Sequence, residues 1–296
     1  MILPRNLLSA VVCLVAAALL QCGSSRQKQA LKPLPAETEP VVIVRSPART
    51  APGDRVGLLV ALHGNDQTED QFTGLWRDGF FHEPNFILAS VRAPFKGNRG
   101  YIWYPRNTKS KGIEGDDRWP RAMQTAEARV IAVCDSLSAC YSIDPDRVHI
   151  VGASLGAAVA AFIYLRHPDV FSGLAMLAGY MNSTYVTMPA EGELADMPVF
   201  IAMGEAEGPR PREGARQNRS ELAAAGADVR LFVHPEGHVI TQPIIRAMQN
   251  HLGLSYSFAP EVHKIETSPG HYEDEGSPQA APEPDQESES TDEQPR

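Results

Sequence analysis

The chain has 296 residues, 43% of them hydrophobic, and a formal net charge of −9 at pH 7. This length and apolar content suit one α/β domain with appended tails. The acidic excess is local, because residues 260–296 hold 11 Asp or Glu against 2 Lys or Arg, whereas residues 1–259 hold 25 of each sign. The domain therefore lacks the positive excess that attracts nucleic acid, and we expect no nucleic-acid partner.

The chain begins with an apolar run from Leu7 to Leu20, which is too short to span a membrane. A basic residue before such a run is typical of a secretory signal, so residues 1–22 are predicted to be a signal peptide. The polar, Pro-rich residues 23–40 read as a flexible tether before a domain at 41–259. Residues 260–296, acidic and rich in Pro and Ser, are expected to be a disordered tail.

The signal ends in Leu-Leu-Gln-Cys-Gly-Ser-Ser, which resembles the lipoprotein signal peptides of bacteria, where the cysteine, here Cys22, is lipidated. Gln21 departs from the Gly, Ala or Ser that usually precedes that cysteine, so a plain cleaved signal or a retained anchor stays open. The resemblance implies export and a lipid anchor at the bacterial cell envelope, in the periplasm or at the outer membrane.

The domain alternates apolar, β-branched runs with helical patterns, which is typical of an α/β fold. Strands are expected at Val41–Arg45, Arg55–Leu62, Phe86–Arg92, Val148–Val151, Gly173–Ala178, Pro198–Gly204 and Val229–His234. Helices are expected at 119–137, 155–167, 213–225 and 241–252. Residues 95–120 and 179–197 are predicted to be loops, and a long loop in a compact domain is usually functional.

The motif Gly-Ala-Ser-Leu-Gly at residues 152–156 joins an expected strand to an expected helix. A serine on such a sharp corner needs strained backbone angles, and Gly152 and Gly156 remove Cβ atoms that would collide with the neighbouring strand and helix. The Ser154 hydroxyl is therefore expected to be exposed. The amide of Leu155, at the positive end of the helix dipole, would point toward a developing oxyanion.

Three motifs together carry a resemblance to a family: His-Gly-Asn at 63–65, Gly-Ala-Ser-Leu-Gly at 152–156 and Pro-Glu-Gly-His at 235–238. In this order they resemble the α/β-hydrolase superfamily, in particular its carboxylesterase, phospholipase and acyl-thioesterase branch, over residues 41–253. The resemblance implies a mostly parallel central sheet flanked by helices on both faces. It also implies that the amide of Asn65 joins that of Leu155 in the oxyanion hole, while the side chain of His63 supports the loop.

In the resembled family the triad follows the order Ser, acid, His, with the acid after the strand at 198–204. This places Glu207 where an Asp is usual, with Glu205 as the competitor. His238, which follows the last strand, is a better candidate base than His234, which lies within that strand or at its end. We expect Ser154, His238 and Glu207 to be nucleophile, base and acid.

The segment around Trp103 and Tyr104 flanks the pocket in the resembled branch, so these aromatic residues are candidate substrate walls, although both could simply pack the loop down. Cys134 and Cys140 lie in a chain expected to be exported, which leaves a disulfide between them open. No spacing resembles a zinc site. We expect neither a metal nor an organic cofactor.

The sequence therefore predicts an exported serine hydrolase that cleaves carboxylic esters of small molecules or lipids through an acyl-enzyme. Two alternatives stay open: a catalytically idle hydrolase-fold surface lipoprotein used for binding, and a serine peptidase of the same fold. The acyl chain length, the alcohol and the preference for esters or thioesters are not encoded in any motif, because loops assemble the pocket.

Overall fold

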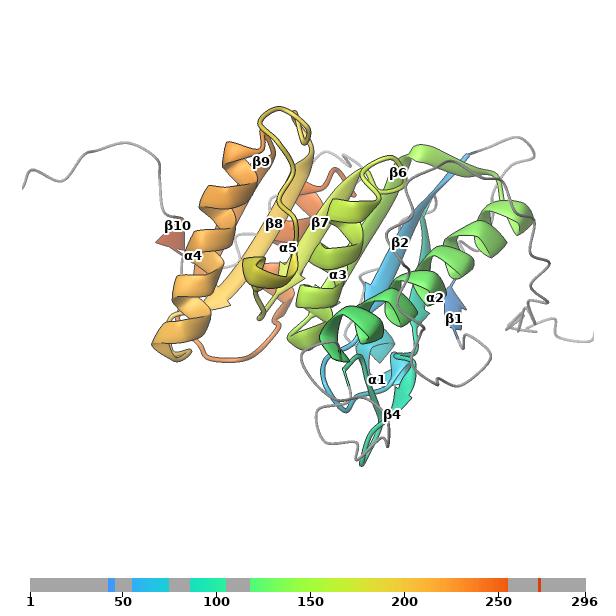
Figure 1. The fold of residues 1–296 in the computed structure, drawn as a ribbon, viewed down its shortest axis with the longest axis horizontal. Coiled ribbons are helices and arrows are strands. Elements are labelled where there is room, and N and C mark those ends of the chain that lie inside the picture. Colours follow the sequence, from blue (N-terminus) through green and yellow to red (C-terminus); the bar gives the residue numbers. More distant parts are fainter. Residues whose placement is uncertain (1–41, 46–54, 75–85, 105–117, 255–270, 273–296) are drawn as a thin grey trace, which may run out of the picture.

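The computed structural model describes residues 42–45, 55–74, 86–104, 118–254 and 271–272 (Figure 1). The predicted signal peptide with Cys22, the tether and nearly all of the acidic tail lie outside these residues. Within the ranges given, no helix combines the length and apolar character needed to cross a bilayer.

An eight-stranded sheet forms the centre, in the order β1-β3-β2-β6-β7-β8-β9-β10. The six inner strands are parallel, whereas β1 and β10 run antiparallel to their neighbours at the two edges. The strands are β1 (Val42–Arg45), β2 (Val56–Leu62), β3 (Phe86–Val91), β6 (Ile143–Ala153), β7 (Gly173–Leu177), β8 (Pro198–Gly204), β9 (Asp228–His234) and β10 (His271–Tyr272). The mostly parallel sheet expected from the sequence is confirmed.

Helices cover both faces of the sheet (Figure 1). They are α1 (Glu69–Gly74), α2 (Arg118–Cys140), α3 (Leu155–Arg166), α4 (Pro209–Ala224) and α5 (Gln242–His251). The side chains of α2, α3 and α4 share one apolar cluster with one face of the sheet. Phe72 of α1 and Met248 of α5 belong to the cluster on the other face. This two-sided cover explains why all seven residues of β2 are apolar or Gly and buried.

The strand register places the loops that carry the candidate site residues together at the carboxyl ends of the parallel strands. Leu62, the last residue of β2, pairs with Gly152 of β6, so the loop from His63 lies beside the turn at Ser154. The loops after β8 and β9 leave the sheet at the same edge, because parallel strands share their carboxyl ends. Glu207 and His238 are carried by these two loops.

Three local features differ from the sequence expectations. Helix α4 begins at Pro209 rather than at 213, because proline fits the first turn, where its missing N–H has no helical partner. Residues 95–102 contain a small hairpin of β4 (Phe95–Lys96) and β5 (Tyr101–Ile102) instead of an irregular loop. Within the tail expected to be disordered, His271–Tyr272 pairs with β9, which needs only backbone hydrogen bonds.

Cys134 and Cys140 are both free thiols, so the disulfide left open by the sequence is absent from the structure. Both residues lie in the continuous helix α2. Six residues along a helix separate them by about 9 Å along its axis, which is too far for a disulfide unless the helix unwinds. Burial raises the pKa of the Cys134 thiol to about 12, so it packs as a neutral apolar group.

Candidate active site

Ser154 occupies a strained turn between β6 and α3, with φ 53° and ψ −117°. A non-glycine residue in this region costs on the order of 1–3 kcal/mol and is found mostly where a site demands it. The Ser154 N–H donates to the carbonyl of Leu177 on β7 at 2.8 Å, which fixes the turn to the sheet. The side chain does not cap α3, so the hydroxyl is available to the neighbouring loops.

The two glycines of the motif allow this turn, for the steric reason that the sequence indicated. A Cβ on Gly152 would lie 2.1 Å from the carbonyl oxygen of Gly156. A Cβ on Gly156 would lie 2.4 Å from the carbonyl oxygen of Leu62. The first glycine therefore lets α3 approach its own strand, and the second lets α3 approach the end of β2.

Three side chains, carried by the segments that follow β6, β8 and β9, meet at the carboxyl ends of the parallel strands. The Ser154 hydroxyl lies 2.9 Å from Nε2 of His238, and Nδ1 of His238 lies 3.2 Å from each carboxylate oxygen of Glu207. In this arrangement Nδ1–H donates to the carboxylate, while Nε2 accepts from the serine hydroxyl. The side chain of Glu207 is 7% exposed and that of His238 55% exposed. The carboxylate thus lies behind an imidazole that faces solvent.

The competing acid and the competing histidine lie elsewhere. Glu205 is exposed and borders a separate cavity of about 230 Å³. His234 is buried, and its Nδ1 pairs with a carboxylate oxygen of Glu236 at 2.8 Å, a hydrogen bond that lowers the pKa of Glu236. The N–H of Glu205 donates to the carbonyl of His234 at 2.7 Å, which ties the loop of Glu207 to the loop of His238.

His63 supports the loop that carries Asn65. Its imidazole is fully buried, Nε2 accepts the N–H of Ala93 at 3.0 Å, and Nδ1 lies 2.8 Å from the carbonyl oxygen of Gly64. Burial lowers the pKa of His63, which agrees with a neutral ring that donates from Nδ1. The N–H of Gly64 donates to the side chain of Gln67 at 2.9 Å. The Gly64 amide is therefore occupied, and the next residue, Asn65, lines the same cavity as Ser154 and Leu155.

The β4–β5 hairpin fastens the same loop from outside. Asp66 accepts hydrogen bonds from the N–H groups of Arg99 and Gly100, both at 3.0 Å, and these bonds lower the pKa of its carboxyl. The N–H of Tyr101 donates to the carbonyl of Gln67 at 2.8 Å. These contacts were missed by sequence reasoning, although the Asp-Gln pair directly after His-Gly-Asn was visible in the sequence.

The ion pair of the buried Glu69 with the half-buried Arg92 extends this support. Nε of Arg92 donates to both carboxylate oxygens of Glu69 at 3.0 Å, and Nη1 of Arg92 donates to the hydroxyl of Tyr101 at 3.1 Å. Glu69 begins α1, and Arg92 directly follows β3. The hairpin, the first helix and the sheet therefore hold the Asn65 loop in one position.

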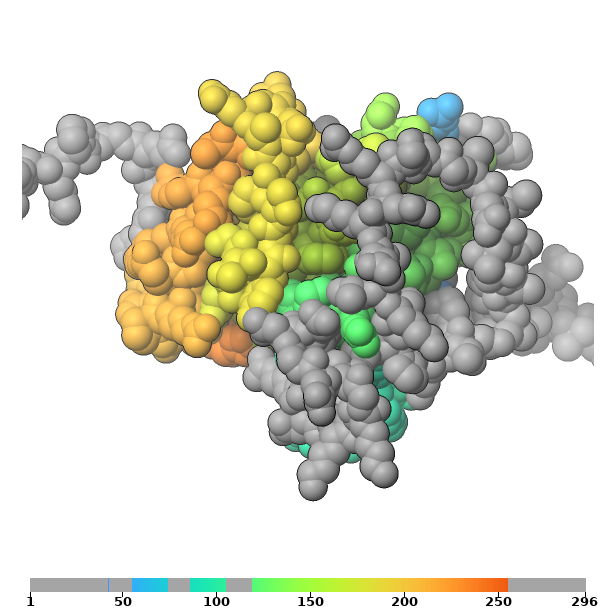
Figure 2. All heavy atoms as spheres, viewed as in Figure 1, coloured from blue at the N-terminus to red at the C-terminus, as the bar shows by residue number. Residues whose placement is uncertain are grey.

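A cavity of about 420 Å³ opens over the serine. The described residues that line it are Asn65, Trp119, Ser154, Leu155, Ala158, Ala178, Gly179, Tyr180, Asn182, Tyr185, Glu207, Pro211 and His238. Several belong to the segment between β7 and β8, which lies on the surface between α3 and α4 (yellow in Figure 2). The aromatic walls are Trp119 at the start of α2 and Tyr180 and Tyr185 in the segment after β7. The sequence did not single them out, because the packing between segments far apart in the chain cannot be read from their residues.

The role of substrate wall considered for Trp103 is corrected by the structure. Trp103 is fully buried, and its Nε1 donates to the carbonyl of His63 at 2.7 Å, so it packs beneath the Asn65 loop. Tyr104 is half-buried and packs edge-on against Trp119 with ring centroids 5.3 Å apart. Tyr104 thus backs a wall residue and is not among the described residues that line the cavity. In the part of the chain that the structure describes, no group of three or more His, Cys, Asp and Glu could hold a metal ion.

Comparisons with known proteins identify a family for the chain. A family model described as "Putative esterase" matches residues 36–235. "Poly(3-hydroxyalkanoate) depolymerase C" of Paucimonas lemoignei is 28% identical over 134 residues, which is 44% of this chain and 30% of that protein. "Putative esterase NocK" of Nocardia uniformis subsp. tsuyamanensis is 32% identical over 97 residues, 33% of this chain and 27% of that protein. The matches thus span less than a third of these curated relatives.

Solved structures share the fold. A carboxylesterase from Mesorhizobium loti superposes with a TM-score of 0.57 at 20% identity, over 74% of this chain and 98% of that one. This likeness shows the α/β-hydrolase fold, as expected from the sequence. Because the family model spans two thirds of the chain, the protein belongs to the esterase family that this model describes.

Proposed function

We propose that this protein is an exported serine hydrolase that cleaves carboxylic esters with Ser154 as nucleophile, His238 as base and Glu207 as the acid. The observation that carries the proposal is the position of the His238 ring, 2.9 Å from the serine hydroxyl on one side and 3.2 Å from the Glu207 carboxylate on the other. Membership of the esterase family supports small-molecule ester substrates. No step requires a cofactor.

In the first half of the reaction, Ser154 Oγ attacks the ester carbonyl carbon while its proton passes to His238 Nε2. The new C–O bond leaves a negative charge on the former carbonyl oxygen. The amides of Asn65 and Leu155 are the proposed donors to this oxyanion, each typically worth about 3 kcal/mol of barrier. When the intermediate collapses, the bond to the alcohol oxygen breaks and Nε2–H protonates the leaving alcohol, so an acyl-serine remains.

In the second half, His238 takes a proton from water, and the hydroxide formed attacks the acyl carbon. The second intermediate expels Ser154 Oγ, which recovers the proton from Nε2, and the acid is released. Glu207 keeps the imidazole in the tautomer with its proton on Nδ1 and stabilises the imidazolium that forms in each half. The backbone hydrogen bond from the Glu205 N–H to the His234 carbonyl joins the loops that carry Glu207 and His238.

A carboxylic ester with a chromogenic leaving group tests the proposal directly. With p-nitrophenyl butyrate, Ser154→Ala is expected to lower kcat by about four or more orders of magnitude relative to wild type. Ser220→Ala, on the exposed surface of α4, is the matched control and should retain wild-type activity. A fluorophosphonate should label the wild type at Ser154, as read by peptide mass spectrometry. Equal hydrolysis by wild type and Ser154→Ala, or a label on another residue, would refute the nucleophile.

Export and lipidation rest on the sequence of residues 1–22. We expect a bacterial host that expresses the full chain to attach labelled fatty acid to Cys22 and to move the domain across the inner membrane. Cys22→Ser should abolish the fatty-acid label. Incorporation of label into Cys22→Ser, or a full-length chain retained in the cytoplasm, would contradict this part of the proposal.

A further inference from the structure

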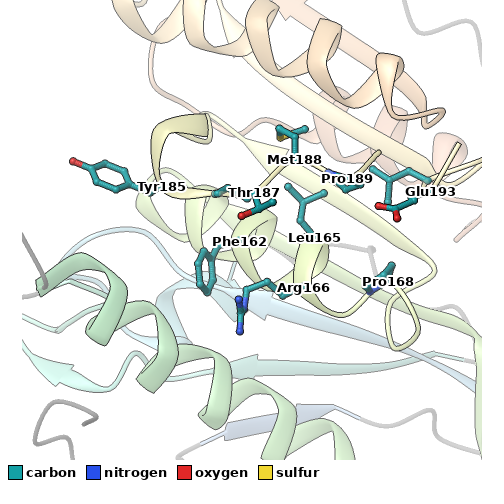
Figure 3. Close-up of a pocket in the computed structure, with 11 residues that line it drawn as sticks. Phe162, Leu165, Arg166, Pro168, Tyr185, Thr187, Met188, Pro189 and Glu193 are labelled. Atoms are coloured by element: carbon teal, nitrogen blue, oxygen red, sulfur yellow. The ribbon is translucent and has the colours of Figure 1, made fainter. Parts of the chain in front are cut away.

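A second hollow lies next to the candidate active site. Its volume is about 550 Å³, and it separates α3 from the segment that follows β7. Figure 3 shows residues 185–189 of that segment opposite Phe162, Leu165 and Arg166 of α3. The aliphatic and phenyl side chains of the lining are Phe162, Leu165, Pro168, Val186, Met188, Pro189 and Leu194, and the charged residues Arg166 and Glu193 line the hollow as well. None of these residues takes part in the proposed reaction steps.

The second hollow and the catalytic cavity lie along the same face of α3, and the two spaces together are called the groove. Leu155 and Ala158 line the catalytic cavity, and Phe162 and Leu165 line the second hollow. Steps of three and four residues keep all four on one side of the helix. Tyr185 lines both spaces. Leu155 and Leu165 are about 15 Å apart along the helix axis, a distance that a butyryl group does not span.

Hydrogen bonds to α4 hold the segment after β7, which forms the wall of the groove opposite α3. The side chain of the buried Asn218 on α4 accepts the N–H of Met181 at 2.7 Å and donates to the carbonyl of Met181 at 2.9 Å. At the other end, the N–H of Leu194 donates to the carbonyl of Ala225 at 3.0 Å. Both ends of the segment are therefore fastened to α4 or its end, and residues 185–189 lie between these anchors.

The proposed chemistry decides which part of an ester enters the groove. The alcohol oxygen must receive its proton from His238, which lines the cavity, so the proposed reaction needs the alcohol near His238. An acyl chain directed instead toward Ala158 and Tyr185, which also line the cavity, would lead to the second hollow.

We propose that the second hollow binds the distal part of the acyl chain of a long-chain ester, so that the enzyme prefers long acyl groups over short ones. This inference rests on the proposed function. Each methylene that enters an apolar site is worth about fourfold in affinity for the transition state. We therefore expect kcat/KM to rise from p-nitrophenyl butyrate to octanoate and dodecanoate as the chain passes Tyr185.

The test compares two variants of the same surface segment. Met188→Asp places a charge in the hollow and should lower the ratio of kcat/KM for dodecanoate to that for butyrate by at least about tenfold. Thr184→Asp adds the same charge on a residue that lines a different cavity, and it should keep the wild-type ratio. A flat chain-length profile in wild type, or an equal loss of the ratio in both variants, overturns the inference.

A binding measurement separates this inference from the proposed function. Calorimetry with free dodecanoate on Ser154→Ala measures the hollow without catalysis, and Met188→Asp in the same background should weaken binding by at least about tenfold. Butyrate ester hydrolysis that depends on Ser154, combined with dodecanoate binding that ignores Met188→Asp, would leave the hydrolase in place and refute the acyl site. Loss of Ser154 dependence with intact, Met188-sensitive binding would refute the hydrolase and keep a fatty-acyl site.

Discussion

Gly156 is a point of close approach between α3 and the end of β2, and its substitution by alanine tests the steric account of the serine turn. The added Cβ would lie 2.4 Å from the carbonyl oxygen of Leu62 and 2.5 Å from that of His63, whereas real Cβ contacts are essentially never below 3.0 Å. Because both neighbours are backbone atoms, α3 and β2 must separate by at least about 0.6 Å.

This separation acts on both stability and catalysis. Forced overpacking of this kind costs about 1–3 kcal/mol of unfolding free energy. It also moves Leu155 away from the Asn65 loop, and a misplacement near 1 Å costs about a hundredfold in rate, so Gly156→Ala should lower kcat by about ten- to a hundredfold. Urea denaturation reads the first quantity, and hydrolysis of p-nitrophenyl butyrate reads the second.

Gly208→Ala is the matched control. Gly208 has φ −60°, and a Cβ there would meet nothing closer than 3.9 Å. We expect a stability change below about 1 kcal/mol and a rate within about twofold of wild type. Wild-type stability and wild-type kcat in Gly156→Ala would refute the reasoning, since the strand and helix would then accommodate the methyl group without displacement.

Three other substitutions address the loop support, a buried histidine and a buried hydroxyl. Asp66→Ala removes the carboxylate that accepts hydrogen bonds from the amides of Arg99 and Gly100, so it should lower kcat with little change in KM. Asp66→Asn should partly restore kcat, and an unchanged kcat in Asp66→Ala would contradict the support role. Burial lowers the pKa of His149 to about 4, below its unfolded value. The neutral ring therefore contributes about 3 kcal/mol of unfolding free energy above pH 6.5, and this contribution is lost as the pH falls toward 4. A plot of urea midpoint against pH should be flatter for His149→Gln than for wild type, and parallel curves would contradict this. Burial raises the pKa of Tyr164, whose hydroxyl has no hydrogen-bond partner among the described residues. Tyr164→Phe should therefore be neutral or stabilising by about 1 kcal/mol in thermal unfolding, and marked destabilisation would contradict this.

The serine turn could be predicted from sequence because its requirement is local. Two glycines around Ser154 are needed by atoms within the motif and by the strand beside it, and this need is visible in the residues themselves. The parallel strands were equally visible, since burial on both faces produces continuous apolar runs such as Val56–Leu62. Glu207 and His238 could be proposed because each follows a recognisable strand at a place where the resembled family carries its acid or its base.

The cavity walls could not be predicted, because they depend on contacts between segments far apart in the chain. Tyr185 lines the catalytic cavity, and Asn218, 37 residues from Met181, holds the preceding loop. Trp103 was a candidate for either the substrate wall or the packing of its loop, and its indole N–H donates to the carbonyl of His63, 40 residues away. A local sequence pattern does not indicate which distant residues an aromatic side chain will contact. It therefore does not distinguish an aromatic residue that lines a cavity from one that packs beneath a loop.

The backbone conformation of Ser154 lowers the stability of the fold, although the candidate site requires the serine side chain at this position. Its φ of 53° suits glycine, so Ser154→Gly should relieve part of a cost on the order of 1–3 kcal/mol, whereas Ser154→Ala keeps a Cβ and should melt close to wild type. Calorimetric melting temperatures of the two variants check this, and equal values would contradict it. A laboratory selection for heat resistance alone would therefore favour loss of the nucleophile. Any programme that stabilises this protein must select for hydrolysis at the same time.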